Sequence, residues 1–208
     1  QENQWEAEVE KGNKLYGPIF AKYAEQPIEE LAKNEEAMKS GQRIFLSYCA
    51  VCHGSTATGN LGFPNLTDHD WLYGAGDNIK KTILDGRVGT MPAKGLKPAM
   101  TEAELQDTVE YVLSLSDRAK DAESAQRGAP IFAQACAACH GADAKGNQMV
   151  GAPNLADDIW LYGGTRKQVE FTIRNGRTGR MPAHRDFLGE DKVHVLASYI
   201  YKLSSDNK

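Results

Sequence analysis

Apolar residues recur along the chain at the spacing of helix faces, and no segment alternates between apolar and polar positions as a half-buried strand does. Ile44 and Phe45 fall on one side of a predicted helix that ends near a cysteine. Ile131 and Phe132 repeat this arrangement further along the chain. The pattern therefore predicts an all-α protein without a strand of any length.

Two segments carry signals for the start of a helix. Thr101, followed three residues later by Glu104, predicts a capping box. Pro27, followed by Glu29 and Glu30, is typical of a first helical turn, because acidic side chains there face the positive end of the helix dipole. The predicted apolar face of the helix after Thr101 consists of Leu105, Val109, Val112 and Leu113.

Residues 1–39 contain an apolar stripe at intervals of three, four or seven, but no chemical motif. Gly12 and the Gly17-Pro18 pair interrupt the stripe, so we expect several helical pieces and not one continuous rod. The segment is either a solvated arm that packs on the rest of the chain or a membrane-proximal segment. The stripe is formed by Trp5, Val9, Tyr16, Ile19 or Phe20, and Tyr23.

The rest of the chain is an internal repeat. Trp71-Leu-Tyr-Gly74 recurs as Trp160-Leu-Tyr-Gly163, and each is followed by Gly-Arg-x-Gly-x-Met-Pro-Ala. So complete a duplication predicts two copies of one small domain, each packed around a large apolar cofactor because it is too short to build a large core. The expected division is an N-terminal arm (1–39), domain 1 (40–116), a charged linker (117–127) and domain 2 (128–208).

Charge and hydropathy exclude some functions. The formal net charge of −4 does not favour binding to nucleic acid. No run of about 18 apolar residues occurs that could span a membrane. The chain begins at a polar Gln1, which is not typical of a signal peptide, so we expect a processed or truncated start.

The four cysteines all lie in two C-x-x-C-H motifs, Cys49-Ala-Val-Cys52-His53 and Cys136-Ala-Ala-Cys139-His140. This is the attachment motif of c-type haem, in which both thiols form thioethers and the histidine ligates the iron. Four thiols could instead form redox-active pairs, or bind zinc together with the histidines. A zinc cluster at either motif would lack a fourth cysteine or histidine nearby.

A haem iron held by one histidine needs a sixth ligand, and the repeat offers a methionine. We expect Met91 to complete the site of His53 and Met181 to complete the site of His140. A thioether favours ferrous iron and raises the reduction potential, which suits electron transfer. Methionine is more often core filler, but here it would have to recur before the same Pro-Ala in both copies. Met100 is the only serious competitor of Met91.

Other side chains of the repeat could contact the haem. The indoles of Trp71 and Trp160 and the guanidinium groups of Arg87 and Arg177 are candidate donors to haem propionates. The alternatives are core packing for each tryptophan and a salt bridge between loops for each arginine. We expect the histidines without a counterpart in the other copy to lie at the surface: His69, His184 and His194.

With C-x-x-C-H, Pro-Asn-Leu and Met-Pro in this order, both copies resemble class I c-type cytochromes. The repeated Trp-Leu-Tyr-Gly element is more specific, and with it the chain resembles the dihaem subunit III (CcoP or FixP) of cbb3-type cytochrome c oxidases. The resemblance implies two tandem class I domains, each around one covalent haem c. It also implies that the carbonyl groups of Pro64 and Pro153 orient the ligating histidines.

The same resemblance implies a function and a place in the cell. Such a subunit accepts electrons from soluble cytochrome c or a quinol-oxidising complex. It relays them to the monohaem subunit and the oxygen-reducing catalytic subunit, on the periplasmic side of the inner membrane. Family members carry an N-terminal membrane anchor, which this chain lacks, so we expect a soluble fragment or a free relative.

No catalytic constellation accompanies the haem motifs, so we expect an electron carrier and not an enzyme. Two six-coordinate haems leave no open iron position for oxygen or peroxide. The alternatives are a free periplasmic dihaem cytochrome shuttle and a dihaem peroxidase. A peroxidase would need one five-coordinate haem, against which the methionine of each copy argues.

Overall fold

The computed structural model describes residues 2–206, apart from the side chains of Glu2 and Trp5, so the predicted place of Trp5 in the stripe lies outside it. The described chain is mainly helical, as expected. In chain order the elements are α1 (Glu2–Ala24), α2 (Ile28–Leu31), α3 (Glu35–Tyr48), α4 (Ala50–His53), α5 (Asp77–Asp85), β1 (Arg87–Met91), α6 (Glu102–Ser114), α7 (Ala122–Ala135), α8 (Ala137–His140), α9 (Arg166–Asn175), β2 (Arg177–Met181), α10 (Arg185–Leu188) and α11 (Glu190–Ser205).

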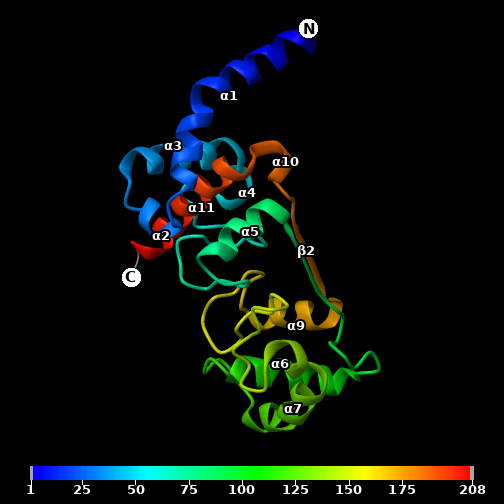
Figure 1. The fold of residues 1–208 in the computed structure, drawn as a ribbon. Helices are drawn as coiled ribbons and strands as arrows, with labels where there is room; N and C mark the ends of the chain where they lie inside the picture. The colour runs from blue at the N-terminus through cyan, green and yellow to red at the C-terminus, as the bar shows by residue number, and fades with distance from the viewer. Residues whose placement is uncertain (1, 207–208) are drawn as a thin grey trace.

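The N-terminal arm consists of α1, α2 and the start of α3, so it is formed of helical pieces as expected, but the breaks predicted at Gly12 and at Gly17-Pro18 were wrong because α1 runs through both. Proline at position 18 leaves the carbonyl group of Lys14 without its usual helical partner. Because Lys14 is exposed, water can replace that hydrogen bond. Gly12 and Gly17 have open space around them and adopt helical dihedral angles without strain. Figure 1 shows how far the helix extends from the rest of the molecule.

Both predicted helix starts are confirmed. Thr101 and Glu104 form a reciprocal capping box at the start of α6, in which each side chain bonds to a main-chain N–H group of the other residue. Pro27 precedes α2, whose first turn carries Glu29 and Glu30. These local signals need no distant partner, which is why they could be read from the sequence.

The prediction that the chain has no strand was wrong. β1 and β2 pair in antiparallel register, with Arg87 opposite Met181, Gly89 opposite Gly179, and Met91 opposite Arg177. Both strands contain a central glycine and charged or polar residues, and neither has the β-branched or aromatic run that predicts a strand. Each strand has only the other as a partner among the described residues, so pairing depends on the tertiary fold.

The last helix of each repeat packs on the other repeat. Helix α11, from the second repeat, packs against α3 and α5 of the first. Helix α6, from the first repeat, packs against α7 and α9 of the second. The structure therefore has a terminal lobe (residues 2–86 and 182–206) and a central lobe (residues 92–176). The paired strands β1 and β2 carry the chain from one lobe to the other and back (Figure 1).

The same helix crossing occurs in both lobes. A Cβ atom at Gly41 of α3 would lie 2.5 Å from Tyr199 Cβ of α11. A Cβ atom at Gly128 of α7 would lie 2.0 Å from the carbonyl oxygen of Asp107 in α6. In each lobe the first helix of one repeat therefore approaches the last helix of the other so closely that only glycine fits.

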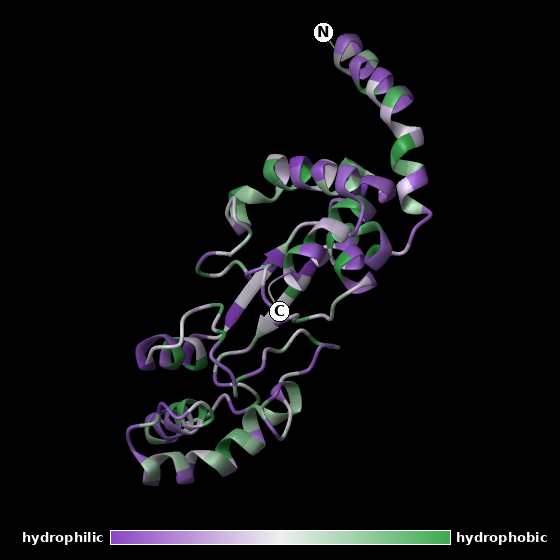
Figure 2. Cartoon of the chain, turned by 90° about the vertical axis from the view of Figure 1, so that its left-hand side faces the viewer, coloured by the Kyte–Doolittle hydropathy of each residue, from purple (hydrophilic) through white to green (hydrophobic). Residues whose placement is uncertain are grey.

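Each lobe has its own apolar core. Phe45, Ile83 and Leu196 are buried in the terminal lobe, and Phe132 and Leu105 in the central lobe. Burying side chains of this kind stabilises the fold by about 1.5–3 kcal/mol each. Figure 2 shows that hydrophilic and hydrophobic positions are mixed along the helices of both lobes and along α1, as expected of helices with one buried face. A third cluster attaches the end of α1 to α11 and includes Phe20, Tyr23, Leu31, Ala37, Met38 and Val195.

One predicted surface histidine is buried. His194 in α11 is only 6% exposed, and its Nε2 donates a hydrogen bond of 2.8 Å to the carbonyl oxygen of Gln26. The prediction for His194 was therefore wrong, because α11 is the helix exchanged into the terminal lobe and is covered there by the arm. His69 is exposed, and His184 is half-buried.

Candidate haem centres

The first C-x-x-C-H motif forms the turn between α3 and the short helix α4. Cys49 ends α3, and His53 ends α4 with only 8% of its surface exposed. Its Nδ1 lies 3.0 Å from the carbonyl oxygen of Pro64. Because a carbonyl oxygen can only accept, Nδ1 carries the proton and Nε2 keeps a free lone pair. This is the tautomer that a ligating histidine needs.

The second motif is built in the same way. Cys136 ends α7, and His140 ends α8 with 7% of its surface exposed. Its Nδ1 donates to the carbonyl oxygen of Pro153 at 3.1 Å. Burial lowers the pKa of both His53 and His140, and only the proline contact opposes it. A lowered pKa favours the neutral ring, which is the form that can bind a metal.

The first cysteine of each motif has a raised pKa. Burial raises the pKa of Cys49 to about 11, with a smaller contribution from Cys52. Burial likewise raises the pKa of Cys136 to about 11, with Cys139 adding to it. A dithiol that exchanges disulfides has a lowered pKa, so the geometry does not favour that alternative. No group of three or more His, Cys, Asp or Glu side chains within residues 2–206 could hold a zinc ion.

The structure packs each methionine against the lobe core that holds the C-x-x-C-H motif of the other repeat. Met181 packs against the terminal core, together with Cys49 and Trp71. Met91 packs against the central core, together with Cys136 and Trp160. The core of each lobe, which holds the C-x-x-C-H motif of one repeat, thus contacts the methionine that ends the connecting strand of the other repeat. This differs from the within-repeat pairing expected from the sequence.

Main-chain contacts hold the exchanged methionine segments in place. Just after Met91, the N–H of Lys94 donates to the carbonyl oxygen of Ile173 in α9 at 2.7 Å. Just after Met181, the N–H of His184 donates to the carbonyl oxygen of Ile83 in α5 at 3.0 Å. The two contacts are equivalent, so the exchange is reciprocal.

The glycine that opens each Gly-Arg-x-Gly motif has a specific role in this exchange. Gly86 has a φ of +70°, and a Cβ atom there would lie 2.5 Å from the carbonyl oxygen of Met181. Gly176 has a φ of +72°, and its Cβ atom would lie 2.4 Å from the carbonyl oxygen of Met91. Only glycine permits both this backbone conformation and the approach of the partner methionine segment.

The predicted propionate arginines lie on tyrosines of the Trp-Leu-Tyr-Gly elements. The guanidinium carbon of Arg87 is 4.3 Å from the ring centroid of Tyr73, and that of Arg177 is 4.4 Å from that of Tyr162. Arg87 Nε also donates to the hydroxyl of Thr82. Neither arginine is paired with a carboxylate among residues 2–206, so the alternative of a salt bridge between loops gains no support.

Trp160 provides a test of whether the pocket fits a haem. Its Nε1 is buried without any hydrogen-bond partner, which is costly unless a missing group accepts the bond. A haem propionate is such an acceptor, so the residues present fit the cofactor. Trp71 packs against the terminal core, and its carbonyl oxygen accepts a hydrogen bond of 3.1 Å from Gln148 Nε2.

Known proteins are similar to this chain over most of its length. The family model for cbb3-type cytochrome c oxidase subunit III matches residues 36–112 and 123–200. The chain belongs to this family. It is a family of electron-transfer cytochrome subunits, so the expected class of protein is confirmed. The two C-x-x-C pairs, Cys49/Cys52 and Cys136/Cys139, are consistent with haem attachment sites.

Individual relatives support the same assignment. The chain is 46% identical over 97% of its length to subunit CcoP of Rubrivivax gelatinosus, and covers 66% of that protein. It is 41% identical over 91% of its length to subunit FixP of Azorhizobium caulinodans, and covers 69% of that protein. The chain therefore spans about two thirds of the length of these subunit III proteins. Within residues 2–206, no helix is both long and apolar enough to cross a bilayer.

The specific Trp-Leu-Tyr-Gly elements of the subunit III repeat form the contact between the lobes. Gly62 N–H donates to the carbonyl oxygen of Leu161 at 2.8 Å. The ring of Tyr73 lies so close to Gly151 that a Cβ atom there would be 2.2 Å from it. The sequence marked these elements as repeated and specific, but it gave no role to their tyrosines. Recurrence of a tyrosine with an arginine in both copies was the available signal.

Acidic side chains also meet at this contact. Burial raises the pKa of Asp70 to about 6, and the charges of Asp157 and Asp68 raise it further. Burial also raises the pKa of Asp68. Asp68 and Asp157 are equivalent residues of the repeat, so the lobes bring the same position together from both copies.

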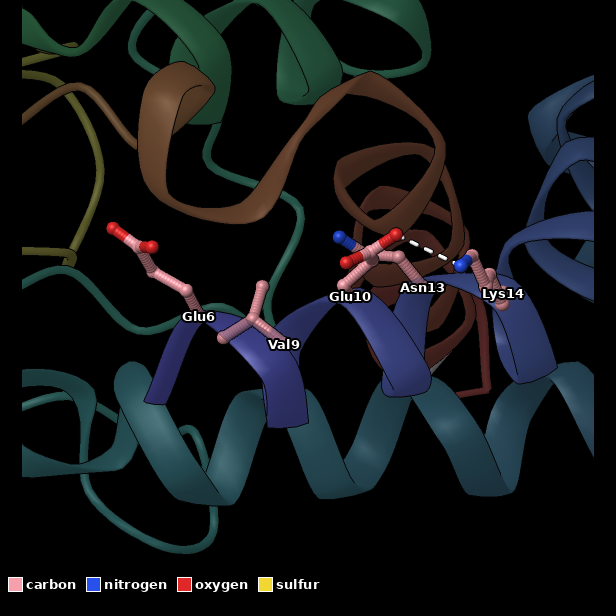
Figure 3. A pocket seen from close by; sticks show the side chains of 5 residues that line it. All are labelled: Glu6, Val9, Glu10, Asn13 and Lys14. Atoms are coloured by element: carbon pink, nitrogen blue, oxygen red, sulfur yellow. Dashed lines mark ion pairs between the residues drawn. The ribbon is translucent and has the colours of Figure 1, made fainter. Parts of the chain in front are cut away.

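A surface hollow on α1 has no part in these centres. Figure 3 shows the side chains that line it, with an ion pair of 2.8 Å between Lys14 Nζ and Glu10 Oε1. All the lining residues come from this one helix, so it brings no haem ligand together. They are Glu6, Val9, Glu10, Asn13 and Lys14.

Proposed function

We propose that the chain binds two haem c groups covalently and passes electrons one at a time. The main support for this proposal is that two sites are built in the same way. Each has a buried histidine whose Nδ1 donates a hydrogen bond to a proline carbonyl group. Each haem supplies an iron that cycles between the ferric and ferrous states. The cysteine pairs Cys49/Cys52 and Cys136/Cys139 anchor the two groups through thioether bonds.

The protein supplies ligands and excludes water. His53 and His140 each offer a free Nε2, fixed in direction by the hydrogen bond of Nδ1. We assign Met181 to the iron of His53 and Met91 to the iron of His140, because these pairs share a lobe core. Thioether ligation favours the ferrous state and leaves no open position for peroxide chemistry. This supports an electron carrier and not an enzyme.

Within the oxidase we place the chain between an electron donor and the catalytic subunits. The donor is a soluble cytochrome c or a quinol-oxidising complex. The acceptors are the monohaem subunit and then the oxygen-reducing subunit, on the periplasmic side of the membrane. Membership of the subunit III family supports this place in the electron path.

Haem content and reduction test the proposal. The purified holoprotein should contain two covalent haems per chain by mass and by haemochrome absorbance. It should be reduced by a soluble cytochrome c and reoxidised by an oxidase complex depleted of its own subunit III. A chain with fewer than two haems, or one that the depleted complex cannot reoxidise, would refute the proposal.

The exchanged ligand pairs need a separate test. In a chain that keeps only the haem of Cys136 and Cys139, Met91→His should lower the potential of the remaining haem, because imidazole replaces the thioether. Met181→His should leave that haem unchanged. Met149→Leu is the matched control, since Met149 is 93% exposed and has no counterpart in the repeat. The opposite result would support the within-repeat pairing.

A further inference from the structure

Arg118 lies just beyond the end of α6, where local geometry fixes its position. Asp117 adopts a left-handed conformation with a φ of +55°, which ends the helix. The N–H of Arg118 then donates to the carbonyl oxygen of Leu113 at 2.9 Å. This hydrogen bond is the capping bond of a Schellman motif, and it turns the chain from α6 back toward the central lobe.

The guanidinium group of Arg118 is held on three sides but one nitrogen has no partner. Nη1 donates to the carbonyl oxygen of Gly164 at 2.7 Å, and Nε donates to Ser116 Oγ at 2.9 Å. The guanidinium carbon lies over the ring of Trp160, 4.6 Å from its centroid. Nη2 is buried without a hydrogen-bond partner. An unpaired buried guanidinium N–H is costly, so this site is incomplete as the protein alone.

The second unpaired donor belongs to the residue under the guanidinium. Trp160 Nε1 is also buried without a partner. Two stacked side chains thus present two unsatisfied N–H donors, and Trp160 packs on the core that includes Cys136 and Met91. An anionic oxygen pair would satisfy both donors, and a carboxylate has this chemistry.

This arrangement exists in only one lobe. Gly164 makes room for it, because a Cβ atom there would lie 2.5 Å from Arg118 Nη1 and 2.9 Å from the Trp160 indole. The residue that matches Gly164 in the first repeat is Ala75, which has a Cβ atom. The residue that matches Arg118 in the second repeat is Asp206, which pairs with Lys202 in its own helix. At the position equivalent to Arg118, the terminal lobe therefore has a carboxylate and not a cation.

We propose that Arg118 and Trp160 together bind a propionate carboxylate of the haem attached to Cys136 and Cys139. The proposal rests on the haem content proposed above. Arg118 is the anchor, and it makes the two haem centres unequal although their histidine and methionine ligands are alike. None of the sequence motifs indicated this residue, which lies in the segment expected to be a linker.

The inequality has a defined sign. Reduction adds one electron, taken from the donor, and lowers the charge of the centre by one. A fixed positive charge nearby favours that more negative state, so Arg118 raises the reduction potential of the central-lobe haem. Removing the charge should lower the reduction equilibrium constant of that haem by about tenfold, which corresponds to about 59 mV for a one-electron couple.

The test is redox titration of the two-haem protein as Arg118→Gln and Arg118→Lys variants. Arg118→Gln should lower the reduction potential of one of the two haem components of the titration and leave that of the other unchanged. Lys should restore most of the potential, because it keeps the charge although it loses the fork that reaches Gly164. Trp160→Phe should move the same component, which assigns the shift to the central lobe. Arg127→Gln is the matched control, because it removes a charge from the same lobe at the Asp107 ion pair.

Each result has a clear meaning. An unshifted component in Arg118→Gln, an equal shift of both components, or an equal effect of Arg127→Gln would overturn the inference. A drop in reduction potential that Arg118→Lys does not restore would also overturn the inference, because a packing role of Arg118 would then explain the change. Haem content is measured on every variant. Fewer than two haems in the unaltered chain would refute the proposed function, whereas two haems with no shift would refute only the role of Arg118.

Discussion

Replacing Gly41 with alanine would test the close crossing of α3 with α11 in the terminal lobe. The added methyl group would lie 2.5 Å from Tyr199 Cβ and 3.1 Å from the carbonyl oxygen of Val195. Overpacking of this kind costs about 1–3 kcal/mol. No change of rotamer relieves a clash with a Cβ atom and the main chain, so we expect the upper end. Alanine gains about 1 kcal/mol over glycine within a helix. The expected net loss in the free energy of unfolding is therefore about 2 kcal/mol.

The matched control is Gly12→Ala in α1, where no atom lies within 4 Å of the added methyl group. That variant should be as stable as the unaltered protein or more stable by up to about 1 kcal/mol. Guanidinium unfolding of the holoproteins at 25 °C, followed by circular dichroism, measures both. The absorbance of the terminal-lobe haem should respond first in Gly41→Ala. If Gly41→Ala were as stable as Gly12→Ala, α3 and α11 would not be in this contact.

Two further substitutions test local predictions. Because the pKa of Asp70 is raised to about 6, ionisation of this side chain destabilises the folded state as pH rises from about 4 through 6. At pH 7.5, Asp70→Asn should therefore be more stable than the unaltered protein by about 1 kcal/mol, after allowance for solvent screening. At pH 4 the two proteins should be nearly equal in stability. Urea unfolding at both pH values measures this, with the exposed Asp158→Asn as control, and a difference that is independent of pH would contradict it. Thr101→Ala should cost about 1 kcal/mol through loss of the α6 capping box, and an unchanged unfolding midpoint would show that this cap contributes nothing.

Short-range signals in the sequence predicted much of the local structure. The capping box of Thr101, the start of α2 and the C-x-x-C-H motifs depend on residues a few positions apart, and the structure contains each of them. The proline carbonyls beside His53 and His140 lie where the resemblance to class I cytochromes placed them. The breaks predicted in α1 from Gly12 and Pro18 did not occur, because an exposed helix tolerates a proline where water replaces the lost hydrogen bond.

The pairing of the two repeats could not be predicted in the same way. An internal repeat reads identically whether its last helix packs on its own copy or on the other, because both copies present the same glycine crossing and the same apolar face. Gly86 and Gly176 do contain a signal, since each must be glycine for the partner methionine segment to approach. This signal can be recognised only when that segment is in place.

The sequence by itself therefore determined the mainly helical character, the two C-x-x-C-H motifs and the candidate ligands, because each is encoded within a few residues. Only the tertiary structure decided which methionine shares a core with which histidine, why the strands exist, and that Arg118 meets Trp160. These features depend on contacts between distant segments, such as Arg118 with Gly164. Helices that are nearly equivalent in sequence can bury their apolar faces against more than one partner helix. In this fold, the close packing at Gly41 and Gly128 forms between helices of different repeats.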